Sequence, residues 1–167
     1  MISTRISRLL LALTAAIGLS VVALSAATTA TPTNYVAHLS AGGEVPTNDS
    51  MAHGELTLQL SADGTELRYR LVVAGLVDVT QAHIHLGAVD VNGPVVAFLY
   101  PEAPPAQLIA GRTDGVLMTG SITASDLRGP LLGLPLSALV TAIESGNTYA
   151  NAHTVLLPGG EIRGQIG

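Results

Sequence analysis

The chain of 167 residues lacks cysteine and lysine. Without cysteine it has no disulfides, no thiolate metal ligands, no cysteine nucleophile and no lipid-attachment cysteine of a bacterial lipoprotein. All seven cations are arginines, and two of them, Arg5 and Arg8, lie at the N-terminus, so that five arginines face twelve acids in the rest of the chain. A nucleic-acid groove needs clustered cations and stacking aromatics, so we exclude nucleic acid as a partner.

Aromatic residues make up only 3% of the chain and charged residues 11%, whereas 48% is hydrophobic. Any core is therefore built from leucine, valine, isoleucine and alanine. With 18 glycines and 9 prolines, the chain is too rich in breakers for a helical bundle. Its length fits one domain. We expect an all-β or β-rich fold.

The N-terminal segment has the pattern of a secretory signal. Arg5 and Arg8 precede an apolar run at residues 9–24, and small residues fill positions 25–30. An uncleaved membrane anchor is the alternative, because the run approaches the ~20 residues that span a bilayer.

Cleavage is expected after Ala27 or Ala30, where small residues occupy the recognition positions. This divides the chain into a signal peptide (1–30), a short linker (31–34) and one domain (35–167). The mature domain is expected to be secreted or periplasmic, with no membrane span after cleavage.

Period-two alternation of apolar and polar residues predicts β-strands. Residues 56–60 and 67–73 show it, and the Asp63-Gly64 pair between them is typical of a hairpin turn. Gly75 is expected to end the second strand. The apolar face of this hairpin, expected in the core, consists of Leu56, Leu58, Leu60, Leu67, Tyr69 and Leu71.

One short helix is predicted from Leu136 to Ile143, because apolar residues recur at helical spacing after Pro135 and Gly146 follows. Residues 101–114 are expected to form a connection. Short strands with Gly/Pro turns indicate an antiparallel sandwich or barrel. The other strands are expected at residues 35–39, 79–86, 95–100, 116–122, 149–156 and 161–166.

Histidines on predicted strands are the candidate metal ligands. His83 and His85 project from one strand face, roughly 6.6 Å apart at ~3.3 Å per residue. His153 lies on a later strand with polar Asn151 on the same face. Three imidazoles suit copper or zinc, whereas magnesium and calcium prefer oxygen ligands. The alternative interpretation is a pair of surface histidines on an edge strand.

Other chemistry has weaker support. His38 and His53 are candidates for a fourth ligand, although an isolated histidine is more often solvated. Glu44 lies in a glycine-rich loop, either as a functional acid or as a cap of local N–H groups. Glu161 and Arg163 alternate on the last strand and are interpreted as an exposed charge pair. The Gly-x-Ser-x-Gly motif is absent, and no catalytic residue is predicted.

Five sequence blocks occur in an order that resembles the CHRD (chordin-type) domain, over Tyr35 to Gln165. That resemblance implies an extracellular, all-β, immunoglobulin-like Greek-key sandwich, found in animal bone-morphogenetic-protein antagonists and in bacterial secreted proteins. It implies the fold better than an activity. The blocks are 39–46, 82–85, 92–96, 146–154 and 158–165.

The His-x-His strand followed by a distant histidine also resembles a reduced copper/zinc superoxide dismutase, whose fold is a similar sandwich. The chain departs from that family because it has no cysteine pair, no bridging-histidine loop and no active-site arginine motif. These departures disfavour a bimetallic dismutase and leave a single-metal site open.

Three functions follow from these observations. The leading hypothesis is a secreted, non-enzymatic CHRD domain that binds copper or zinc through His83, His85 and His153. The enzyme alternative is a mononuclear copper redox protein that scavenges superoxide. The third is a metal-free module that binds an extracellular or periplasmic protein.

Overall fold

The computed structural model describes residues 33–167, so the signal peptide and the first residues of the linker lie outside the described part of the chain. The α-helix is α1 (Leu136–Glu144), and the 3-10 turns are η1 (Ala41–Gly43), η2 (Ala124–Asp126) and η3 (Gly129–Leu131). The strands are β1 (Thr33–Ser40), β2 (His53–Leu60), β3 (Leu67–Leu86), β4 (Val95–Tyr100), β5 (Ile109–Ile122), β6 (Thr148–Thr154) and β7 (Ile162–Gln165).

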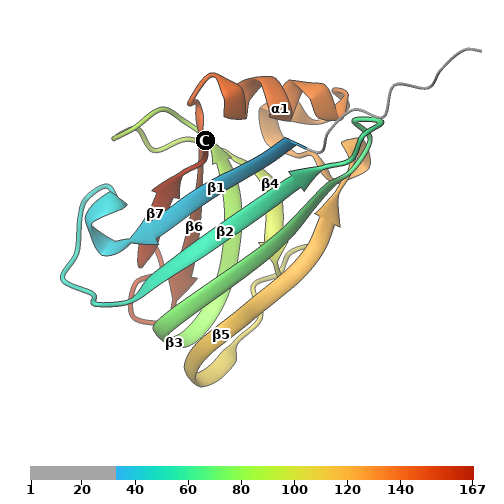
Figure 1. Ribbon diagram of the computed structural model, residues 1–167. Helices are drawn as coiled ribbons and strands as arrows, with labels where there is room; N and C mark the ends of the chain where they lie inside the picture. The colour runs from blue at the N-terminus through green and yellow to red at the C-terminus, as the bar shows by residue number, and fades with distance from the viewer. Residues whose placement is uncertain (1–32) are drawn as a thin grey trace, which may run out of the picture.

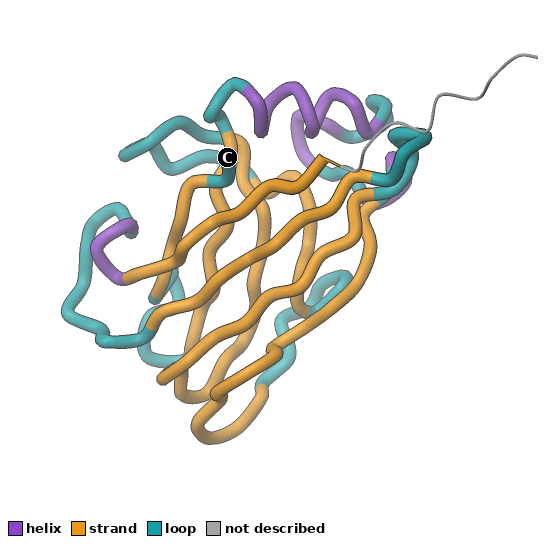
Figure 2. The backbone as a smooth tube through the Cα atoms, in the orientation of Figure 1, coloured by secondary structure: helices purple, strands orange, loops and turns teal. Residues whose placement is uncertain are grey.

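Five strands close into an antiparallel barrel in the order β1-β2-β3-β6-β7, and β4 and β5 pair with β3 outside this circuit. Ser40 pairs with Arg163, which joins β7 back to β1. The predicted antiparallel β fold with one α-helix is confirmed. The separate sheets of an immunoglobulin-like or dismutase-like sandwich are replaced by a barrel (Figure 2). The reason is that β3 belongs to both halves of the sheet: its first half pairs with β2 and its second half with β6.

The long strand β3 corrects two expectations. Gly75 does not end it, because Gly75 (φ +81°) and Asp78 (φ +56°) instead form bulges within one 20-residue strand. The Gly111 N–H donates to Asp78 Oδ1 (2.7 Å), and the Gly75 N–H donates to Asp114 Oδ1 (2.8 Å). These bonds hold β5 against the bulges, so β5 begins at Ile109, inside the expected connection.

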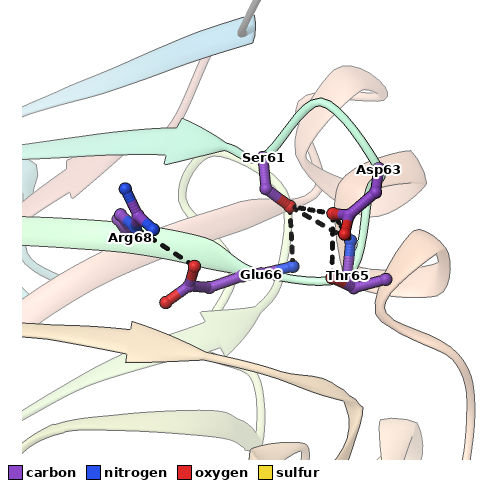
Figure 3. A network of polar contacts seen from close by, with 5 residues as sticks. All are labelled: Ser61, Asp63, Thr65, Glu66 and Arg68. Carbon is purple, nitrogen blue, oxygen red and sulfur yellow. Dashed lines mark hydrogen bonds and ion pairs between the residues drawn. The ribbon is translucent and has the colours of Figure 1, made fainter. Parts of the chain in front are cut away.

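The hairpin between β2 and β3 is held by a network of side chains (Figure 3). Ser61 Oγ donates to Asp63 Oδ1 (2.6 Å) and accepts from the Glu66 N–H (3.0 Å). The Thr65 N–H donates to Asp63 Oδ1 (3.1 Å), and Arg68 Nε to Glu66 Oε2 (3.1 Å). The hydroxyls of Ser61 and Thr65 lower the pKa of Asp63 to about 2. The turn therefore fixes the register of the two strands.

The predicted core face of this hairpin is confirmed. Five of the six residues are buried and Leu60 is half-buried against them, whereas Arg68 and Arg70 are exposed. The helix α1 lies across one end of the barrel (Figure 1) and contributes Leu136, Leu139 and Ile143 to the core.

Strand β6 is buried along its whole length. Ala150 and Ala152 belong to the hydrophobic core inside the barrel. Alternation therefore directs Tyr149, Asn151 and His153 to the outer face, where loops cover them. This covered outer face contains the candidate site.

Candidate metal centre

His83, His85 and His153 form one buried group, here named the histidine cluster. His83 and His85 alternate on β3 with core residues, and the β3–β6 register places Asn151 opposite His83 and Gln81 opposite His153. One ligand atom from each histidine lies within 4.8 Å of the others. The predicted convergence is confirmed. The alternative of a surface pair is wrong, because these side chains are only 4–9% exposed.

The spacing of the ring nitrogens fits one metal ion. Nitrogens bound at about 2.1 Å in a tetrahedron lie about 3.4 Å apart. His83 Nδ1 and His153 Nε2 are 3.3 Å apart. The widest separation is at most 4.8 Å, so side-chain movement of about 1.4 Å would bring all three nitrogens to this spacing.

Two backbone carbonyls fix the tautomers of the cluster. His85 Nδ1 lies 2.8 Å from the Gly93 oxygen, and His153 Nδ1 lies 3.0 Å from the Pro158 oxygen. Because a carbonyl oxygen only accepts, each Nδ1 carries the proton and each neutral ring keeps a lone pair on Nε2. Histidine ligands of metals are oriented in this way by their second nitrogen.

Two ring nitrogens of the cluster have no hydrogen-bond partner among the described residues. They are His83 Nε2 and His85 Nε2, and both are buried. An unsatisfied buried polar atom costs ~1–3 kcal/mol, so it requires an explanation. Coordination of a metal ion through Nε2 would remove this cost at His85.

Burial keeps the three imidazoles neutral. It lowers the pKa of His83 to about 3, and the nearby His153 and His85 act in the same direction. Burial also lowers the pKa of His85 and of His153, although hydrogen bonds to Gly93 and Pro158 oppose part of each shift. Neutral imidazole is the metal-binding form, so the cluster is ready for ligation at neutral pH.

Aromatic side chains wall the cluster. Phe98 meets His83 edge to face at 5.0 Å between ring centroids, and Tyr149 stacks on His85 at 4.7 Å and 9°. The Arg163 guanidinium lies 3.4 Å above the Tyr149 ring. The Arg163 cation, the Tyr149 phenol and the His85 imidazole therefore form one stack that holds the His85 ring in place.

The interpretation of Glu161 and Arg163 as an exposed pair is wrong. Both are buried, and Arg163 donates to the Val91 carbonyl oxygen (2.9 Å). Glu161 accepts from the hydroxyls of Ser50 and Thr154, each at 2.6 Å. Alternation along β7 does not reveal the loops that cover its outer face.

Asn151 and Glu44 border the cluster. Asn151 Oδ1 lies 3.0 Å from His153 Nε2. Glu44 is 5% exposed, and its carboxylate packs so closely on Gly160 that a Cβ there would clash. Burial raises the pKa of Glu44 to about 7, against opposing effects of Arg163, the Val45 N–H and the Asn151 amide. The sequence indicated Glu44 only by its glycine-rich loop.

The two other histidines lie away from the cluster. His38 and His53 are exposed, and His38 Nδ1 lies 3.4 Å from Glu55 Oε2. Neither belongs to the group that can hold a metal ion. The structure therefore gives no support for a fourth ligand from these positions.

The sequence pattern of the CHRD domain matches residues 35–166, and the chain belongs to the CHRD domain family. A search of curated proteins and a search of solved structures each gave no match. Within the described residues, no helix has the length and apolar character needed to cross a membrane.

Proposed function

We propose that this CHRD domain is a non-enzymatic module that binds one copper or zinc ion through His83, His85 and His153. The observation that carries the proposal is the set of three buried histidines with ligand atoms within 4.8 Å. His85 and His153 have Nδ1 tied to a carbonyl, and His85 Nε2 has no hydrogen-bond partner among the described residues. Coordination of a metal ion by these neutral rings accounts for both features.

The donor set limits the metal. Three imidazoles, with no thiolate or carboxylate among them, suit Zn²⁺ or copper and disfavour Mg²⁺ and Ca²⁺. Three protein ligands leave one coordination position open. Because the histidines are nearly inaccessible, the arrangement favours storage or structural binding of the ion over turnover of a substrate.

The site of action is proposed to be outside the cytoplasm. The Arg-flanked apolar run within residues 1–30 supports export, and a chain without cysteine is insensitive to disulfide chemistry in an oxidising compartment.

Titration of Cu²⁺ and Zn²⁺ into the metal-free domain tests the proposal. His83→Ala, His85→Ala and His153→Ala are each expected to lose most of the affinity. The matched controls, His38→Ala and His53→Ala, are expected to bind like wild type because both side chains lie outside the cluster. Wild-type affinity in the first three variants, or an equal loss in the controls, would contradict the proposal.

A further inference from the structure

Glu44 is a buried acid without an adequate partner. Its side chain is nearly inaccessible, and Oε1 has no hydrogen bond within the described residues. A buried carboxylate is costly unless a positive charge or hydrogen bonds compensate it. Neighbouring Arg163 lowers the pKa of Glu44, but burial raises that pKa by more. The positive charge of Arg163 therefore compensates the carboxylate only in part. The residue therefore requires a further explanation.

Glu44 and the histidine cluster meet at the loop 158–160. The Glu44 carboxylate packs on Gly160, and His153 Nδ1 lies 3.0 Å from the Pro158 carbonyl oxygen. Glu44 is not itself among the atoms that can share a metal ion. It therefore lies outside the set of possible ligand atoms, against the loop that also holds His153.

A divalent ion in the histidine cluster would create an excess of positive charge there. Three neutral imidazoles add no charge, and buried Arg163 adds a further positive charge nearby. The buried acids of the described chain are Glu44 and Glu161. Glu161 accepts hydroxyl hydrogen bonds with both oxygens, which leaves Glu44 as the acid next to the site.

We propose that Glu44 is the counter-charge of the metal centre. Its carboxylate balances a divalent cation held by the histidine cluster. The inference rests on the proposed metal binding and adds to it a dependence on the charge of the ion: Glu44 stabilises a divalent ion more than a monovalent one.

Copper provides the test, because one element offers both charges at one site. Glu44→Gln keeps the shape of the side chain and removes its charge, and Glu161→Gln is the matched buried control. Removal of a residue that supports the ligands costs ~10–100-fold in metal affinity. We expect this loss for Cu²⁺ and a much smaller loss for Cu⁺. The reduction potential of bound copper then rises by about 59 mV per tenfold selective loss.

Competition with chelators gives the two affinities, and voltammetry of the copper-loaded protein gives the potential. A merely structural role lowers both affinities equally and leaves the potential unchanged, which would overturn the inference. Unchanged Cu²⁺ affinity in Glu44→Gln, or an equal rise of potential in Glu161→Gln, would also overturn it. These three outcomes leave the proposed function intact. Wild-type protein that binds no copper would overturn the proposed function and this inference with it.

Discussion

The neutral, buried state of His83 predicts how the metal-free protein responds to acid. The pKa of His83 is about 3 in the folded protein and about 6.5 when unfolded. Between these values the unfolded chain binds a proton that the folded chain does not. The contribution of His83 to the free energy of unfolding is therefore largest above pH 6.5 and is lost as the pH falls toward 3. From pH 7 to pH 5 the loss at this residue is about 2 kcal/mol.

The substitution His83→Gln isolates this contribution, because it removes the titrating group and keeps a polar side chain. His85 and His153 add losses in the same direction, whereas the raised pKa of Glu44 has the opposite effect over this range. Wild type and His83→Gln both contain His85, His153 and Glu44, so these three contributions cancel when the two proteins are compared. Wild type is therefore expected to lose about 2 kcal/mol more than His83→Gln between pH 7 and pH 5.

Urea denaturation in the presence of a chelator measures both proteins at each pH, and linear extrapolation gives the free energy of unfolding. Equal losses in wild type and variant would refute the reasoning, because they would show that His83 takes up protons equally in the folded and unfolded states.

Three further predictions concern the core, the metal affinity and export. Leu58→Ala is expected to cost ~2–5 kcal/mol in urea denaturation because Leu58 is 1% exposed, and an equal cost for Gln59→Ala would contradict the register. Measured by competition, the copper affinity of the Glu44→Gln variant, which lacks the acid whose pKa is raised to about 7, is expected to stay constant from pH 7.5 through pH 6.5, because burial lowers the pKa of all three site histidines. A loss that begins at pH 6.5 would indicate solvated ligands. Mass spectrometry of the exported protein is expected to find a chain that begins at residue 28 or 31, and an intact Met1 would favour a membrane anchor.

Local alternation predicted the faces of the strands well. His83 and His85 alternate with alanine and isoleucine, so their common face followed from the sequence, as did the apolar face of the β2–β3 hairpin. The meeting with His153 depends on the antiparallel register of β3 and β6, which was a hypothesis until the strands were placed. The chemistry of three histidines was therefore predictable, and their geometry was not.

The parts that sequence reasoning missed depend on contacts between distant segments. Gly75 has a positive φ, which is typical of a residue that ends a strand. Pairing with β5 nevertheless keeps Gly75 inside β3 as a bulge. The outer face of β7 was predicted to be solvated, because the loops that cover it come from other parts of the chain. Arg163 reaches one such loop through Val91, and this contact places its cation above Tyr149. Residue types along a single strand carry no signal of such coverage.

The metal content of the protein, purified without added metal, decides whether the histidine cluster holds an ion. Elemental analysis of wild type is compared with His85→Ala, which removes one of the unpartnered ring nitrogens. About one copper or zinc ion per chain is expected in wild type and close to none in the variant. Wild type that carries neither metal, or His85→Ala that retains a full equivalent, would contradict this expectation.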